Sequence, residues 1–413
     1  MLDNRKKLRD REVTLSLNIY DFAWIAAIAA VSAVCLELFY RMIVNYNGKY
    51  ESDIGYYALE RTQSTEPQER LVGILCQWLF DINQSTLEIN IMLALVIAAI
   101  IVANFAVIRF FLREDGLLES VPRRAVQVFS VAMLFIGPIY VPVIHEYFYR
   151  KSFSSFCWHS PTQHFMTLFA MIAAVCFLRM YMPYDTEGVS VKWWIATLIT
   201  TFLATTSKPS YTIGLVFTIV IMFIAELIRK GADGFLVRFR RMFIMGMSVV
   251  PSGLYIIWLN KRQFADNTQF GEEHEIVFGL GPLLNYERPW AALLFGITFA
   301  IAVFAFNLKK FRDTKYKFAL YTFVIGTLQW ATISETGTRS NFGNFSWGRM
   351  FGCYFITLTA CAVFLEMYYN RDFFSSRSKR TAAMAVIGLI LAASVICQLY
   401  HFYLILTGHG YMR

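Results

Sequence analysis

The chain has 413 residues, of which 57% are hydrophobic and only 16% are charged. Soluble domains have about a quarter charged residues, so this composition excludes a disordered chain and argues against a water-soluble globule. The formal net charge is +9. The basic residues lie between apolar runs and form no stripe with interleaved aromatic side chains, so they indicate membrane topology and anionic headgroups. Nucleic-acid binding is not expected.

The first apolar run, Phe22–Tyr40, is too long for the hydrophobic region of a signal peptide and predicts an uncleaved first span. Ten more runs of spanning length follow it. We therefore expect an all-α polytopic integral membrane protein with about 11 transmembrane helices, forming one domain over Met1–Arg413. The predicted spans are Phe22–Tyr40, Leu87–Phe111, Ala125–Ile144, Phe165–Met182, Lys192–Thr205, Pro209–Ile228, Met242–Leu259, Trp290–Phe306, Phe318–Ile333, Met350–Tyr369 and Ala382–Leu406.

A polar segment, Thr205–Ser210, interrupts the continuous apolar stretch Trp193–Ile228. Its lysine, its proline and its four hydroxyls favour a turn over a kink. With two spans here and a cytoplasmic N-terminus, 23 of the 38 Lys and Arg residues lie on the cytoplasmic side. A single span would place the three most basic later loops outside, against the positive-inside rule. Two spans are therefore the better prediction.

The largest predicted outer loop, Arg41–Glu88, contains an amphipathic segment. Apolar residues at helical spacing between Arg70 and Asp81 predict a helix that lies flat on the outer leaflet. Cys76 and Cys157 are the two cysteines in outer loops, and a disulfide between them is an open alternative to two free thiols.

Acids, bases and hydroxyls gather in the predicted outer loops, whereas the cytoplasmic loops hold mostly Lys and Arg. Asp53 follows the first span, and Glu146 follows the third. A carboxylate in either position could take a proton from an attacking hydroxyl or ligate a divalent ion through oxygen. A solvated loop acid and a helix-end cap are the alternatives. The distribution nevertheless indicates a reaction or recognition site on the outer face.

Three basic side chains precede later spans. His159 and His164 flank a turn that enters a helix at Pro161, where the imidazoles and the helix N-terminus could contact an anion. Zinc is not expected, because no ligand cluster of suitable spacing accompanies them. Lys208 is costly between two apolar spans unless it meets lipid headgroups or binds a phosphate.

The segment before the tenth span, Glu335–Arg349, is rich in glycine, aromatic and charged residues. Arg339 could grip a phosphate bidentately, and aromatic residues such as Trp347 could stack on a sugar or an isoprenoid. An interfacial aromatic belt explains the aromatic residues but does not explain Glu335 and Arg339 together.

This layout resembles the GT-C glycosyltransferases, polytopic enzymes that take a sugar from a polyprenyl-phosphate or polyprenyl-diphosphate carrier on the non-cytoplasmic side. Asp53 stands where that family has its hallmark acid in the first outer loop, and Glu146 matches a second acidic position after span three. Three further motifs look like those of bacterial cell-envelope proteins of this type: Trp158–Thr162, Lys208–Ser210, and Glu335–Arg339 followed by Gly343-Asn344-Phe345.

The resemblance implies a direct displacement at the anomeric carbon, with inversion. Asp53 would accept the proton of the acceptor hydroxyl, while Lys208, Arg339 and His159 stabilise the departing lipid phosphate. The implied partners are a polyprenyl-linked sugar donor, a glycan, polymer or lipid acceptor, and membrane lipid. The implied location is a bacterial plasma membrane with the site on the extracytoplasmic face.

The resemblance adds Glu335 and Asn344 to the expected substrate-binding residues, and His164 belongs to them through its place beside the start of a helix. Ser52 precedes Asp53 where an adjacent pair of acids would be expected, so the sequence implies no certain cofactor and leaves a divalent metal open. No large outer domain precedes Arg413, and we expect a glycan or lipid acceptor in place of a protein.

Two other functions remain open. An O-antigen-type polymerase or ligase would rely on Arg and His in a late outer loop larger than Lys261–Arg288. A lipid-linked-glycan transporter or flippase would carry ionisable residues well inside its spans, where this chain has few.

Overall fold

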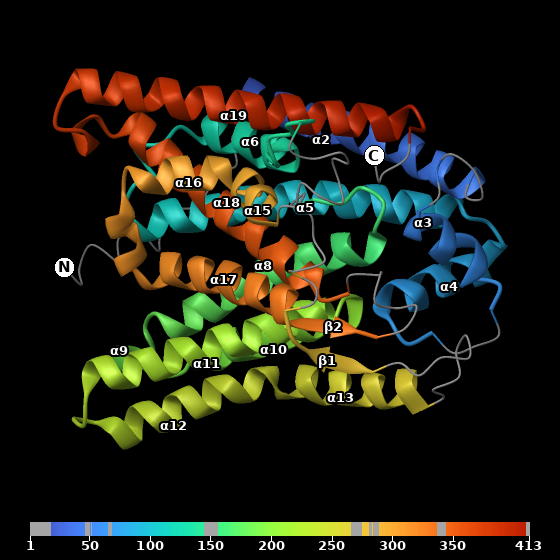
Figure 1. Cartoon of the computed structure of the whole chain (residues 1–413), viewed down its shortest axis with the longest axis horizontal. Coiled ribbons are helices and arrows are strands. Elements are labelled where there is room, and N and C mark those ends of the chain that lie inside the picture. The colour runs from blue at the N-terminus through green and yellow to red at the C-terminus, as the bar shows by residue number, and fades with distance from the viewer. Residues whose placement is uncertain are drawn as a thin grey trace.

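The structure is a computed structural model of the chain, in which long helices run side by side along the longest axis (Figure 1). The described residues are 18–45, 50, 52–64, 68–143, 156–265, 275–280, 283, 289–336 and 344–409. Besides helices, this part of the chain contains two short antiparallel strands, which the all-α expectation did not include. Strand β1 (Ile276–Phe278) pairs with β2 (Ile333–Glu335), and Ile276 lies opposite Glu335.

The helical elements are of three kinds. Helix η1 is π-helical, and the other η elements are 3₁₀ helices. In chain order they are α2 (Ile19–Val44), α3 (Asp53–Gly55), η1 (Tyr56–Glu60), α4 (Leu71–Asn83), α5 (Leu87–Glu114), α6 (Arg123–Ala132), η2 (Met133–Phe135), α8 (Pro161–Tyr181), α9 (Tyr184–Glu187), α10 (Val191–Ser207), α11 (Ser210–Lys230), α12 (Phe235–Gly246), η3 (Met247–Val249), α13 (Val250–Ala265), α15 (Pro289–Gly296), α16 (Thr298–Ala305), η5 (Leu308–Arg312), α17 (Thr314–Thr332), α18 (Ser346–Tyr369), η7 (Arg371–Phe373) and α19 (Arg377–Leu406).

Seven helical segments among the described residues are long and apolar enough to cross a membrane. The chain therefore has the build of a helical membrane protein. The seven segments are Ile19–Val44, Leu87–Glu114, Pro161–Tyr181, Ser210–Lys230, Phe235–Arg262, Ser346–Tyr369 and Arg377–Leu406.

Two predicted spans are interrupted by non-helical residues. In Ala125–Ile144 the helix ends at Phe135, and non-helical chain follows it as far as Val143. Pro138 and Pro142 lie in this non-helical part, where a missing amide hydrogen and the ring of proline oppose a continuing helix. Trp290–Phe306 is divided between α15 and α16 by a break at Ile297 that no proline signals.

Other local predictions are confirmed. Helix α8 begins with Pro161 as its first residue, and α10 ends at Ser207 before α11 begins at Ser210. Helix α4 covers the predicted amphipathic stretch. Cys76 and Cys157 are free, buried thiols in the structure, so the disulfide alternative is wrong.

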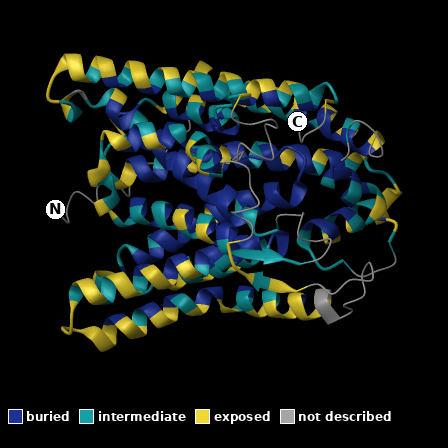
Figure 2. Cartoon of the chain, in the orientation of Figure 1, coloured by how far each residue is buried: buried dark blue, intermediate teal, exposed yellow. Residues whose placement is uncertain are grey.

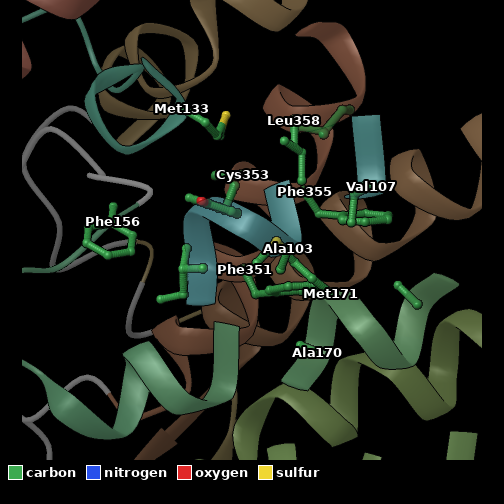
Figure 3. Close-up of a cluster of buried hydrophobic side chains, with 14 of the residues drawn as sticks. Ala103, Val107, Met133, Phe156, Ala170, Met171, Phe351, Cys353, Phe355 and Leu358 are labelled. Atoms are coloured by element: carbon green, nitrogen blue, oxygen red, sulfur yellow. The ribbon is translucent and has the colours of Figure 1, made fainter. Parts of the chain in front are cut away.

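The core surrounds α18. Its most apolar 18-residue stretch is 89% buried, against 17% for that of α2 at the periphery. Figure 2 shows the buried residues in the centre and the exposed ones along the outer helices. In Figure 3, side chains of α5, η2, α8 and α18 meet in one apolar cluster. Its labelled members are Ala103, Val107, Met133, Phe156, Ala170, Met171, Phe351, Cys353, Phe355 and Leu358.

Glycines let α17 and α18 approach at backbone distance. A Cβ atom on Gly326 would lie 2.6 Å from the carbonyl oxygen of Gly348, and one on Gly352 would lie 2.7 Å from the Cα of Phe323. Larger residues would force the two helices apart. This contact fixes the start of α18 against the end of α17.

Candidate active site

Asp53 is the first residue of α3, directly after the segment that follows α2. The Ser52 hydroxyl accepts a hydrogen bond from the Gly55 amide at 3.3 Å and caps this short helix. The chain continues into the π-helical turn η1, a rare conformation that is frequent at functional sites. The Asp53 side chain is half-buried. It is therefore held by a capped turn at the edge of the core.

Lys208 lies between α10 and α11 and is only 6% exposed. Its ammonium donates to the Thr162 hydroxyl at 3.2 Å and lies 3.3 Å from the centre of the Trp347 ring. Thr162 and Trp347 belong to the first turns of α8 and α18. Lys208 thus points into the protein, which contradicts a role limited to contacting lipid headgroups.

The Asp53 carboxylate interacts electrostatically with four basic side chains. They come from the start of α4, the turn before α8, the first turn of α8 and the α10–α11 connection. They are Arg70, His159, His164 and Lys208. One acid from the segment after α2 therefore interacts electrostatically with basic side chains from three later segments. Three of the four, all except Arg70, were predicted as site residues.

Burial governs the charge of two of these groups. It lowers the pKa of Lys208 to about 7, although the Asp53 carboxylate opposes the shift and Arg70 adds to it. Burial also lowers the pKa of His159 to about 3, again with Asp53 in opposition. At neutral pH the His159 imidazole is therefore neutral and can act only as a hydrogen-bonding group. Lys208 can change its charge near neutrality.

His164 is held from both sides. Its Nε2 donates to the Cys157 carbonyl oxygen at 2.6 Å, and the imidazole stacks on Phe156 with ring centres 5.3 Å apart. Its Nδ1 is buried without a hydrogen-bond partner among the described residues. The contacts on Nε2 and on the ring face give His164 a part in shaping the turn before α8.

Uncharged polar groups are buried in the first two turns of α8, just after Lys208 and at the start of α18. Gln163 and Thr167 are one turn apart on α8, Ser210 follows Lys208 by two residues, and Trp347 contacts it. Within the described parts of the chain, the amide of Gln163, both hydroxyls and the Trp347 indole nitrogen lack hydrogen-bond partners. An unmade buried hydrogen bond costs about 1–3 kcal/mol. Such groups suit a ligand with several hydroxyls.

Glu335 and Asn344 form a pair of their own. Asn344 Nδ2 donates to Glu335 Oε2 at 2.6 Å and connects β2 to the residues before α18. Trp347, three residues after Asn344, reaches Lys208. Trp347 therefore connects the start of α18 to Lys208, one of the basic side chains that interact with Asp53.

Two predicted site residues, Glu146 and Arg339, lie outside the described residues. In the described segments, no three His, Cys, Asp or Glu side chains come together as a metal-binding group. Of the two carboxylates predicted as possible ligands of a divalent ion, Asp53 and Glu146, only Asp53 lies among the described residues.

Arg70 is a site residue that sequence reasoning missed. It stands at the N-terminal boundary of α4, where it hydrogen-bonds to Tyr57 and interacts with Asp53 and Tyr255. A helix dipole disfavours a cation at this end, and that unfavourable position was the available signal.

Comparison with known protein families finds no matching family, and comparison with curated proteins finds no match.

Proposed function

We propose that this chain is a GT-C-type membrane glycosyltransferase that transfers a sugar from a polyprenyl-phosphate carrier to an envelope glycan, polymer or lipid. The proposal includes eleven spans, a cytoplasmic N-terminus and a site on the outer face of a bacterial plasma membrane. The observation that carries it is the electrostatic interaction of Asp53 with Arg70, His159 and Lys208. A carboxylate that interacts with several basic groups suits an acidic phosphate donor and a hydroxyl acceptor.

In the proposed reaction, the acceptor oxygen forms a bond to the anomeric carbon while the bond from that carbon to the phosphate oxygen breaks. Asp53 takes the acceptor proton, and the electron pair of the broken bond leaves with the lipid phosphate. Lys208 and Arg70 stabilise the charge that grows on this phosphate. His159, being neutral, contributes a hydrogen bond.

The test uses purified full-length protein with a panel of radiolabelled polyprenyl-phosphate sugars and a crude envelope glycolipid extract as acceptor. We expect transfer from at least one donor, with stoichiometric release of polyprenyl phosphate. Release of the lipid phosphate without any donor sugar in an acceptor would indicate hydrolysis. Movement of intact donor across vesicles, without chemical change, would favour a transporter.

A further inference from the structure

A cluster of arginines lies at the opposite end of the bundle from Asp53. Arg109 and Arg113 belong to the last turns of α5, and Arg123 is the first residue of α6. The guanidinium carbons of Arg109 and Arg123 lie 5.5 and 5.9 Å from the centre of the same Phe105 ring. The charge of Arg109 also interacts unfavourably with Arg113 and Arg123. Three positively charged side chains therefore lie together at the joint between α5 and α6, where α5 ends and α6 begins.

Protein groups compensate only part of this charge. Among the described residues, Asp21 is the one carboxylate that pairs with the cluster, at 3.2 Å from Arg123. Asp21 already accepts hydrogen bonds from the Gln127 side chain at 2.7 Å and from the Asn18 amide at 3.1 Å. This buried carboxylate caps α2, so it does not neutralise three guanidinium groups.

The start of α6 adds to the positive potential. Pro122 precedes the helix, and no side chain caps its first amides. Arg123 and Arg124 stand in the first turn, where the helix dipole disfavours cations. An anion at this joint would meet free amides and guanidinium groups together.

The cluster lies at the end of two helices that are long and apolar enough to span a membrane. Helix α2 has 26 residues, so at 1.5 Å per residue about 39 Å separates this joint from the Asp53 end. Arg109 is half-buried one turn before the exposed Arg113, within an apolar helix long enough to span. Its aliphatic stem can remain in hydrocarbon while its guanidinium reaches the headgroups.

We propose that Arg109, Arg113 and Arg123 bind the phosphate of an anionic membrane lipid, on the face opposite the candidate active site. Guanidinium groups suit this ligand because they hydrogen-bond phosphate bidentately and remain charged. The lipid is the source of the phosphate because the aromatic floor, Phe105 with Trp24 at 5.0 Å, lies within the apolar parts of α5 and α2. This inference does not depend on glycosyl transfer.

The experiment compares thermal unfolding and native mass spectra of the full chain in three preparations. These are phosphatidylcholine nanodiscs, the same discs with phosphatidylglycerol, and the first discs with inorganic phosphate added. Variants Arg109→Gln and Arg123→Gln remove single guanidinium groups. Arg240→Gln removes one exposed charge elsewhere, on α12, and is the matched control.

We expect phosphatidylglycerol to stabilise the wild type and to co-purify with it. Each cluster variant should bind this lipid about fivefold more weakly, while Arg240→Gln should resemble the wild type. Arg109→Lys should recover only part of the loss, because lysine lacks the planar fork. Equal lipid binding by all variants would overturn the proposal. Full stabilisation by inorganic phosphate alone would overturn the lipid as the source.

Discussion

The ammonium of Lys208, two residues before α11, lies 3.3 Å from the centre of the indole ring of Trp347, in the first turn of α18. An ammonium over an indole face is attracted by the ring quadrupole, and the attraction grows when both groups are desolvated. The contact holds the lysine in the interior although burial disfavours its charge. An anionic ligand would attract this ammonium more strongly than the indole ring does.

Donor binding should depend on the charge of Lys208. With a pKa of about 7 in the protein, Lys208 is charged below neutrality and loses its proton above it. The groups that face it are Asp53, Arg70, Cys157 and His159. We expect the affinity for a polyprenyl-phosphate donor to fall as pH rises through about 7, measured by equilibrium binding.

A charge-retaining variant checks this assignment. Lys208→Arg should flatten the pH dependence, since arginine stays charged, and Lys208→Ala should bind weakly at every pH. Lys261→Ala, an exposed lysine near the end of α13, is the control and should keep the wild-type profile. An unchanged profile in Lys208→Arg would assign the titration to another group.

The packing of Gly348 should position Lys208 and Trp347. A Cβ atom there would lie 2.9 Å from Gln329 Oε1 and 3.1 Å from the Ser210 carbonyl oxygen, which accepts from Gln329 Nε2 at 3.0 Å. Gly348→Ala should therefore shift α18 against α11. We expect at least a tenfold loss of donor affinity together with a change in tryptophan fluorescence.

The matched control for this change is Gly388→Ala on α19, where no atom lies within 4 Å of the added Cβ. It should leave binding unchanged and slightly favour the helix. Wild-type affinity in Gly348→Ala would show that the site tolerates a shift of α18.

A buried charge network should stabilise the opposite end of the bundle. Asp115 accepts from Lys310 at 2.8 Å, from Lys315 at 2.5 Å and from the Tyr316 hydroxyl at 2.7 Å. Asp115→Asn would leave two lysines without this carboxylate. We expect a loss of about 3–5 kcal/mol in the free energy of unfolding, measured in detergent. Asp313→Asn, an exposed acid 4.0 Å from Lys315, should cost little.

The same network should make the free energy of unfolding depend on pH in acid. Burial raises the pKa of Asp115, but hydrogen bonds from Lys310 and Lys315 outweigh it, and the pKa is lowered below its ordinary value of 3.8. The contribution of Asp115 is present above that value and is lost as pH falls through its pKa in the folded state. Wild-type stability should therefore fall more steeply below about pH 4 than that of Asp115→Asn. Parallel curves would contradict this.

Sidedness can be tested with single cysteines in a cysteine-free background. Ser64→Cys should react with an impermeant maleimide in intact cells, whereas Gly231→Cys and Ser375→Cys should react only after permeabilisation. The reason is the excess of Lys and Arg in the loops around the last two positions. Labelling of Gly231→Cys from outside would reverse the proposed topology at Lys208.

The apolar pattern was sufficient to place most helices, because a membrane helix must satisfy its backbone internally over about 20 apolar residues. The apolar pattern alone did not predict that the helix ends at Phe135, because the chain beyond it stays apolar although it contains Pro138 and Pro142. The polar clusters identified Asp53, His159 and Lys208. The contact of Lys208 with Trp347 joins distant parts of the sequence, and only the packing of α11 against α18 reveals it.

The most direct test of the proposed chemistry is sugar transfer by Asp53→Asn, which keeps the volume of the side chain and removes its basicity. With a donor that the wild type uses, we predict a loss of at least about a hundredfold in the transfer rate, since a general base contributes about that much or more. Asp81→Asn, an exposed acid on α4, should transfer at the wild-type rate. Activity of Asp53→Asn within about threefold of the wild type, in folded protein, would contradict the role of Asp53 as the base.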